Sequence, residues 1–248
     1  MRKLSPFKAV SHALNSVWSY RAVALRIGMV WAPVLLIAGL LEYFSGPTDP
    51  GTPETAGQAF IELVAGVISI AAVCSMGVSW HRFILRDELR TGLRLDSPVL
   101  RYAGNTLLIM LAMLVPGLVL VSLLAYMPAQ AALIGVPLVI IAGVAATRLS
   151  IKLPAVALGN KGFGFREAWA ASAGNFWPCA GVFLLNGAII LATLLVLTLV
   201  AGFLATVNEA LSLVFQLLSL VALQVFYAIF NASIFTSLYG FFVERRDF

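Results

Sequence analysis

RLSIKLPAVALGNKGFGFREAWAASAGNFW, residues 148–177, is the longest polar interruption in a chain that otherwise consists of apolar runs. It separates four apolar runs from the last two and contains four basic residues, a proline and a glycine-rich turn. We expect Pro154 to stop the helix that enters this segment. Residues 163–177 are predicted to form a short amphipathic helix at the membrane surface. The segment therefore divides the chain into a group of four helices and a group of two.

The composition indicates the class of protein. Of the 248 residues, 61% are hydrophobic and 11% are charged, and the mean hydropathy is +0.97. Soluble domains carry about 25% charged residues. We therefore expect an all-α integral membrane protein, a polytopic helical bundle whose length leaves little for a soluble domain.

Six apolar runs are long enough to cross a bilayer, because a span needs about 20 residues. No charged residue lies between Arg101 and Arg148, and this stretch is too long for one span, so we divide it at residues 126–130. The sixth run is so long that its helix must tilt, break or project into the cytoplasm. In a single membrane domain covering residues 1–248, the predicted spans are 22–43, 58–80, 105–125, 131–147, 179–205 and 210–243.

Residues 6–19 are predicted to form an amphipathic helix that lies in the membrane interface. Ser5 is a suitable N-cap, and Pro6 is favoured at the first helical position. We expect no signal-peptide cleavage, because the following apolar run is too long and lacks a small-residue site. A solvated leader is the alternative. The apolar side of the predicted helix consists of Leu4, Phe7, Val10, Leu14, Val17 and Trp18.

The basic residues predict the orientation. Under this assignment the 16 lysines and arginines all lie on one side of the membrane. The predicted external loop, residues 45–57, contains Asp49 and Glu54 but no basic residue. The positive-inside rule then places both termini and both long loops in the cytoplasm. The net charge of +5 accordingly indicates topology and contact with acidic lipid, and it does not indicate nucleic-acid binding.

Basic residues beside the spans are predicted to contact anionic lipid headgroups. If the second helix continues past Trp80, four arginines at four-residue spacing form one cationic ridge on it. The central segment contributes three more cations. The predicted headgroup contacts are Arg82, Arg86, Arg90, Arg94, Arg148, Lys152 and Arg166.

The sequence contains no recognisable catalytic, cofactor-binding or metal-binding motif. His12 and His81 are predicted to be interfacial, without further ligands at metal-binding spacing, and Cys74 and Cys179 to be free buried thiols. Residues 159–164 superficially suggest a phosphate loop, but they lack the Walker spacing and a preceding strand. We therefore expect no enzyme activity, no cofactor and no metal site.

The sixth span has a polar face. Its members recur at helical spacing, and exposing amide groups to hydrocarbon is costly, so this face should turn toward protein or water. Hydrogen bonding inside the bundle, a wet cavity and a docking surface for a partner subunit are all compatible with the pattern. The polar face consists of Glu209, Ser212, Gln216, Ser219, Gln224, Tyr227 and Asn231, of which Glu209, Gln216, Gln224, Tyr227 and Asn231 form the predicted packing or partner face.

Several short stretches resemble a known group of proteins: WHRFIL at residues 80–85, RLSIKLP at 148–154, EAW at 167–169 and GNFW at 174–177. They resemble uncharacterised six-helix bacterial inner-membrane proteins. More distantly, the pattern is similar to the membrane domain of some bacterial glycerophosphodiester phosphodiesterases. The resemblance implies this architecture and a location in the bacterial inner membrane. No appended catalytic barrel is present, so the hydrolase activity is not carried over.

These features favour a non-enzymatic accessory or scaffolding subunit that associates with membrane lipids or with a larger membrane protein complex. The alternative is a small-molecule or lipid transporter or channel, and a lipid-handling enzyme comes third. A transporter would need polar groups near mid-membrane and broken helices at matching places in two halves. The sequence offers only part of that pattern and no clear repeat.

Overall fold

The computed structural model describes residues 2–45 and 55–247, and this part of the chain forms helices and no strand. Most of the predicted external loop, including Asp49 and Glu54, lies outside the described residues. Six helical stretches are long and apolar enough to cross a membrane, as expected of a multi-pass membrane protein. The helices are α1 (Pro6–Ser19), α2 (Arg21–Ser45), α3 (Ala56–Arg86), α4 (Ser97–Tyr126), α5 (Pro128–Ser150), α6 (Lys152–Ala157), α7 (Phe165–Ala171), α8 (Phe176–Val207) and α9 (Glu209–Phe242).

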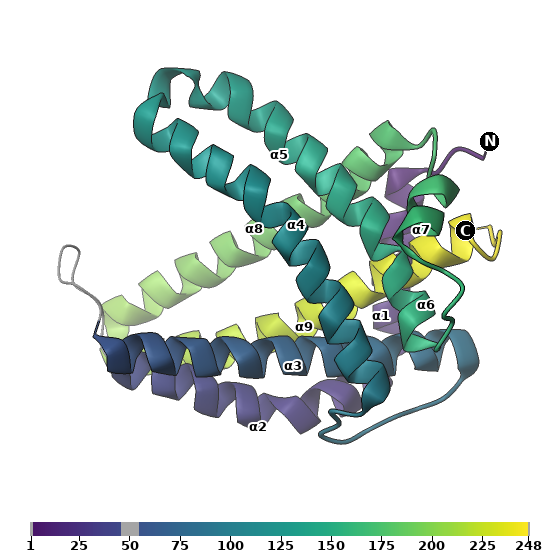
Figure 1. Cartoon of the computed structure of the whole chain (residues 1–248). Coiled ribbons are helices and arrows are strands. Elements are labelled where there is room, and N and C mark those ends of the chain that lie inside the picture. The colour runs from purple at the N-terminus through teal and green to yellow at the C-terminus, as the bar shows by residue number, and fades with distance from the viewer. Residues whose placement is uncertain (1, 46–54, 248) are drawn as a thin grey trace.

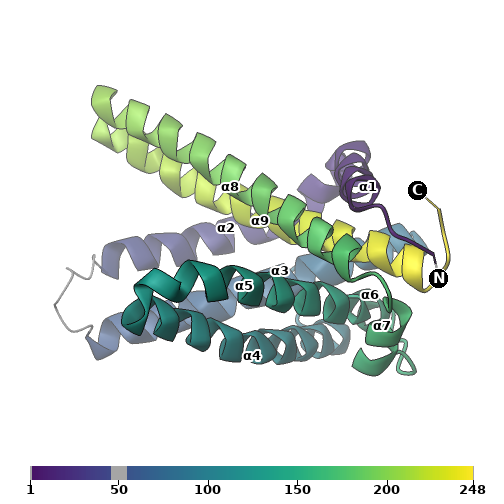
Figure 2. The ribbon, with the colours of Figure 1, turned by 90° about the horizontal axis from the view of Figure 1, so that it is seen from above.

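Three helical hairpins, α2–α3, α4–α5 and α8–α9, meet at the end of the molecule that carries both termini (Figure 1). We call this the basal end; it also holds residues 87–96 and 151–175. At the opposite, distal end, α4 turns into α5 at Met127 and α8 turns into α9 at Asn208. The α8–α9 hairpin diverges from α2 toward the distal end (Figure 2). The hairpins are therefore joined at one end and splayed at the other.

Helix α9 is the centre of the basal half, where it packs against α1, α2, α3, α6 and α8. Small side chains such as Ala228, Ala232 and Ser233 are buried there, and small residues let helix backbones approach closely. By contrast, only 6% of the most apolar window of α4, and the same share in α8, is buried inside the protein. Lipid or another protein must cover the rest of these two helices.

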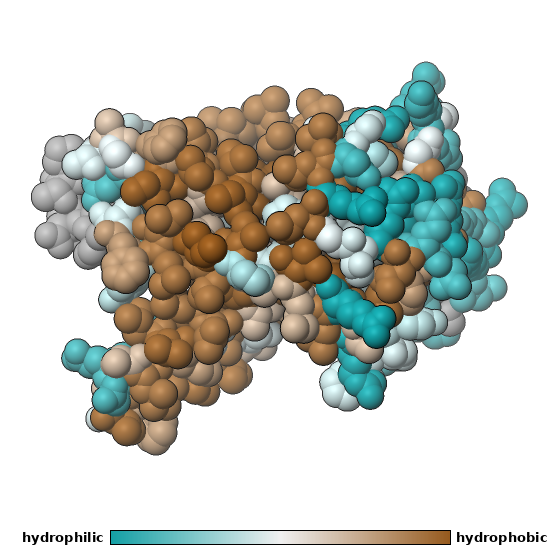
Figure 3. Space-filling view, turned by 90° about the horizontal axis from the view of Figure 1, so that it is seen from below, coloured by the Kyte–Doolittle hydropathy of each residue, from teal (hydrophilic) through white to brown (hydrophobic). Residues whose placement is uncertain are grey.

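The surface has the polarity of a membrane protein. Hydrophobic residues cover the long middle of the molecule in the view from below, and hydrophilic residues gather at the basal end (Figure 3). Exposed apolar side chains are found along the whole length of α4, from Leu100 to Leu124. In a bilayer such side chains face hydrocarbon without the penalty that water would impose.

Local signals determine where several helices begin and end. Helix α1 starts at the predicted place, because the Ser5 side chain accepts the Lys8 backbone N–H and Pro6 occupies the first turn. Helix α3 starts with a capping box between Thr55 and Gln58. It ends at Arg86 because Asp87 adopts a left-handed conformation, with φ of 55°.

The central segment differs from the prediction in two ways. Pro154 does not end a helix; it lies inside α6, and the break comes at Ile151. Proline lacks an N–H and crowds the carbonyl four residues earlier, so the helix is interrupted before Pro154 and not at it. The predicted helix over residues 163–177 is also wrong in extent, because α7 ends at Ala171 and Gly174, with φ of 73°, redirects the chain into α8.

Helix α9 is continuous over 34 residues. At 1.5 Å per residue it is about 51 Å long, against a hydrocarbon core of about 30 Å. A helix of this length was predicted to tilt, to break or to project from the bilayer. Because α9 is continuous, a break is excluded.

Candidate functional site

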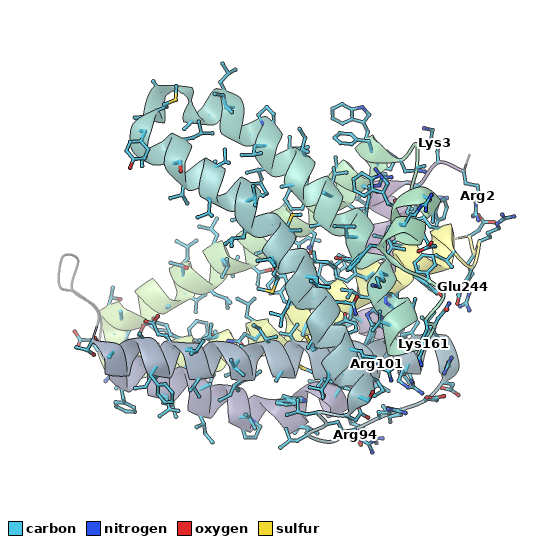
Figure 4. The ribbon with its side chains drawn as sticks, in the orientation of Figure 1. Arg2, Lys3, Arg94, Arg101, Lys161 and Glu244 are labelled. Atoms are coloured by element: carbon cyan, nitrogen blue, oxygen red, sulfur yellow. The ribbon has the colours of Figure 1, made fainter. Side chains whose placement is uncertain are left out.

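Basic side chains gather at the basal end. Arg2, Lys3, Arg94, Arg101 and Lys161 all lie there, beside Glu244 of the C-terminal segment (Figure 4). They come from four separate stretches of the chain, which the convergence of the hairpins brings together. The basal end therefore presents positive charge directly beside the hydrophobic belt.

The predicted single ridge of four arginines does not form. Helix α3 ends at Arg86, so Arg82 and Arg86 are helical while Arg90 and Arg94 follow the last turn. Arg90 instead pairs with Asp96, the N-cap of α4, at 3.2 Å between Nη1 and Oδ2. The reversal at Asp87 ends the helical spacing on which the ridge depended.

Arg82 is directed into the protein. It is buried; its Nη1 donates to the Ala157 carbonyl at 2.9 Å, and its Nε donates to Glu88 Oε2 at 2.9 Å. The bond from Arg82 lowers the pKa of Glu88. Arg82 therefore holds α6 and the α3–α4 connection against the end of α3. Its guanidinium is too buried to contact a lipid headgroup.

Arg148 is also used inside the protein. Its Nε donates to Ser172 Oγ at 2.8 Å, its Nη2 donates to the Trp169 carbonyl at 2.6 Å, and its guanidinium lies 3.7 Å from the centre of the Trp169 ring. These contacts tie α7 to the end of α5. Trp169 is 45% exposed and covers the Arg148 guanidinium.

The other predicted headgroup residues are more accessible. Arg86, Arg94 and Arg166 are exposed, and Arg90 and Lys152 are partly exposed. The Lys152 ammonium lies 3.8 Å from the centre of the Phe165 ring. Exposed cations beside an apolar belt are suitable for anionic headgroups.

His81 faces neither lipid nor water. It is fully buried, with Nδ1 2.8 Å from Thr236 Oγ1 and Nε2 3.1 Å from Tyr102 Oη. Thr236 gives its own proton to the Ala232 carbonyl, so Nδ1 must be the donor and Nε2 accepts from Tyr102. A neutral, satisfied histidine thus connects α3, α4 and α9.

No metal cluster is found among the residues that the structure describes, where no three His, Cys, Asp or Glu side chains come together. Cys74 and Cys179 are free and buried, as predicted. His12 lies in α1 with Nδ1 2.9 Å from Ser237 Oγ of α9, which makes it a packing contact between these helices.

The distal part of the α9 polar face lines an open space. Ser212, Gln216 and Ser219 border a cavity of about 1010 Å³ between α2, α8 and α9, together with Glu42 at the end of α2. Ser212 Oγ donates to the Ala201 carbonyl of α8 at 2.8 Å, and Gln216 Nε2 donates to Ser212 Oγ at 3.0 Å. Glu209 is exposed at the distal tip. Polar groups are thus present in a lateral opening of an otherwise apolar belt.

The basal part of the same face turns inward. Asn186 of α8 donates through Nδ2 to Asn231 Oδ1 at 2.9 Å, and Asn231 donates to the Tyr227 carbonyl. Gln224 Oε1, Tyr227 Oη and Asn186 Oδ1 are buried and have no hydrogen-bond partner in the described part of the chain. Asn186 also borders a cavity of about 170 Å³ with Thr147.

A second opening in the belt is almost entirely apolar. It lies between α2 and the middle of α9, has a volume of about 650 Å³, and has Arg21 as its one charged lining residue. Gly28 of α2 lies against Val225 of α9, where a Cβ would come within 2.2 Å of a valine methyl group. The helices therefore touch at Gly28 and leave space along the groove.

No known protein family, curated protein or solved structure matches the chain. The site must therefore be interpreted from its geometry. Two features follow from that geometry: a cationic basal end, and polar side chains in a lateral opening of the belt.

Sequence reasoning missed three polar residues of the basal core. Tyr102 and Thr236 were not singled out, although both bind His81, and Asn186 was not connected to Asn231. The sequence did contain a signal for Asn186, which lies in an otherwise apolar run. A lone Asn in hydrocarbon needs a hydrogen-bond partner.

Proposed function

We propose that this protein is a multi-pass accessory or scaffolding subunit of the bacterial inner membrane, without catalytic activity of its own. It would hold anionic lipid at its basal end and another membrane protein along its splayed distal side. The location follows the resemblance to bacterial six-helix inner-membrane proteins and to the membrane domain of some glycerophosphodiester phosphodiesterases. The lipid contacts follow the exposed cations Arg86, Arg94 and Arg166.

The observation that carries the proposal is the cavity of about 1010 Å³ bordered by Ser212, Gln216 and Ser219. Polar groups in hydrocarbon need hydrogen-bond partners. Gln216 is exposed, and among the residues that the structure describes its side chain is hydrogen-bonded to Ser212 alone. A helix of a second membrane protein that enters this opening would supply such partners and would cover apolar surface of α8. An accessory subunit requires such a lateral surface.

The orientation is part of the proposal. The basic residues at the basal end support a cytoplasmic location for both termini. Reporter fusions at Asp49 and Glu209 should then behave as periplasmic, and fusions after Asp96, Gly162 and residue 248 as cytoplasmic. A cytoplasmic signal from the fusion at Glu209 would contradict this orientation.

Photo-crosslinking in intact membranes tests the docking role. A crosslinking amino acid at Gln216 or Ser219 should give a discrete adduct with a second polypeptide in a fixed ratio to this chain. The matched control is Val214, two residues away on α9, exposed, and not part of the cavity lining. Identical adducts at Gln216 and Val214, or lipid adducts alone, would contradict the proposal.

The second candidate is a small-molecule transporter. It is favoured by the cavity beside Asn186 and by Gln224 Oε1 and Tyr227 Oη, which have no hydrogen-bond partner among the described residues. Transport requires water to reach this face. Single cysteines at Gln216, Gln224 and Asn231, in a background without Cys74 and Cys179, separate the two candidates. Labelling of all three by a membrane-impermeant thiol reagent would favour transport, and protection at Gln224 and Asn231 would favour the accessory role.

A further inference from the structure

A small cavity of about 220 Å³ opens at the basal end between α4, α6 and the loop that leads to α7. Three basic residues line it: Arg101 of α4, Lys152 of α6 and Lys161 of the loop. Asn105 and Asn160 add amide groups to the lining. Arg101 and Lys161 project from this part of the basal end (Figure 4). The cavity is therefore a convergence of positive charge from three separate elements.

Acidic neighbours offset these charges only in part, because the Glu167 carboxylate acts electrostatically on Lys152 without forming an ion pair with it. In the part of the chain that the structure describes, Arg82, Arg90 and Arg246 each form an ion pair, whereas Arg101, Lys152 and Lys161 form none. Glu167 Oε2 accepts the N–H of Gly164, a residue of the cavity lining, at 2.8 Å. Backbone hydrogen bonds lower the pKa of Glu167, so it is ionised. Three positive charges thus face one negative charge that the backbone already binds.

The loop is held in a defined shape. The Asn160 N–H donates to the Ala155 carbonyl at 2.9 Å, and the Gly162 N–H donates to Asn160 Oδ1 at 3.1 Å. Gly159 takes a left-handed conformation with φ of 77°, and Phe163 packs edge-on against Tyr239 of α9 with ring centres 5.7 Å apart. A binding surface that is already ordered loses little conformational entropy when a ligand arrives.

The size of the cavity limits the ligand. Sites for drug-sized molecules have volumes of about 300–1,000 Å³. A volume of about 220 Å³ corresponds to about seven water molecules at 30 Å³ each. That space accommodates a phosphate group and its first substituents but not a nucleotide.

We propose that this cavity binds a phosphate group, carried by an anionic membrane lipid or free in solution. Arg101 offers a planar guanidinium that can bind two phosphate oxygens, and Lys152 and Lys161 add point charges. The hydrophilic end of the molecule adjoins the hydrophobic belt (Figure 3), so a lipid whose phosphate is held at this end can keep its acyl chains in the bilayer. The lipid form of this proposal rests on the proposed function, which places anionic lipid at the basal end. The cavity itself is separate from the proposed docking surface, which lies at the opposite end of the molecule.

Native mass spectrometry of the purified chain tests the lipid source. Phosphatidylglycerol and phosphatidylcholine are titrated separately against the wild-type protein, the double variant Arg101→Gln/Lys161→Gln and the control Arg245→Gln, which changes a residue outside the cavity lining. Both altered residues and the control are exposed basic residues at the basal end, so no buried contact is lost. The wild type should retain one phosphatidylglycerol tightly, and the double variant should bind it about tenfold or more weakly.

Titration calorimetry with inorganic phosphate forms the second arm. The site would be assigned to free phosphate if the wild type and Arg245→Gln bind phosphate and the double variant does not. Phosphatidylglycerol binding with the same dependence would assign it to lipid. Equal losses in the double variant and in Arg245→Gln would show non-specific surface charge and would overturn the proposal. Unchanged binding of both ligands in the double variant would also overturn it.

Discussion

The basal and distal halves of the bundle consist of the same kind of apolar helix, yet they pack differently. In the basal half, Trp80, His81 and Phe230 are fully buried, and polar bonds join α3, α4, α6 and α9. In the distal half, Phe44 of α2 and Phe203 of α8 are 76% and 67% exposed. Each distal hairpin holds together, but the hairpins separate from one another (Figures 1 and 2).

The difference shows what packs helices in a membrane. Leucine and phenylalanine are as well solvated by lipid tails as by protein, so apolar side chains alone do not draw helices together. The basal half has small residues such as Ala232 and Ser233 and buried polar groups that need partners. The distal half has mainly bulky apolar side chains, which hydrocarbon or a partner protein can cover.

The largest contrast is expected from truncating a large apolar residue in each half. Trp80→Ala should lower the free energy of unfolding by about 3 kcal/mol, because it leaves a cavity among α2, α3 and α9. Phe203→Ala should leave it unchanged, because lipid or detergent fills the space. Unfolding by sodium dodecyl sulfate, followed by circular dichroism, measures both. Equal losses would mean that the distal half is also packed.

Breaking a buried polar contact of the basal half should have the next largest effect. Arg148→Gln removes two hydrogen bonds and the stacking on Trp169, at a cost of about 2 kcal/mol. Helix α7 should loosen, so proteolysis within residues 159–175 should accelerate. The control Arg94→Gln changes an exposed arginine and should shift stability by less than about 0.5 kcal/mol. Similar proteolysis of both variants would show that Arg148 does not hold α7.

Hydrogen bonds between the two helices of one hairpin should contribute equally to stability in the basal and distal halves. Removing the Asn186–Asn231 bond by Asn231→Ala, or the Ser212–Ala201 bond by Ser212→Ala, should cost about 0.6 kcal/mol each. A double-mutant cycle between Asn186 and Asn231 isolates the first bond. A much larger cost at Ser212 would indicate that the distal opening is closed in the membrane.

The smallest expected effect depends on pH. Arg82 lowers the pKa of Glu88 in the folded protein below the ordinary value of 4.5, so this pair stabilises the fold above pH 4.5. The contribution is lost as the pH falls through the lowered pKa. The wild type should therefore be more stable than Glu88→Gln at neutral pH, and this difference should fall toward zero at acidic pH. Thermal unfolding from pH 3 to pH 7 measures it. A difference that stays constant over this range would exclude the ion pair as its origin.

The helical class and the six apolar stretches could be predicted from the sequence, because they depend on composition and on run length. Helix α1 was also predictable, since Ser5 and Pro6 are local signals that act on their own neighbours. The residues at which each helix begins and ends were harder to predict. Asp87 ends α3 and Gly174 redirects the chain into α8, and both adopt left-handed conformations that no run of apolar residues announces.

Tertiary structure alone decided the roles of the polar residues. The spacing of Arg82 and Arg148 suggested lipid contacts, but their partners Glu88, Ala157, Ser172 and Trp169 are brought to them only by folding. A sequence gives the spacing of charges along one helix, whereas the partner of a charge is set by helices that arrive from elsewhere in the chain. The composition of this chain thus determined its helical, apolar class, and the packing of its basal half determined which polar groups remain free to bind.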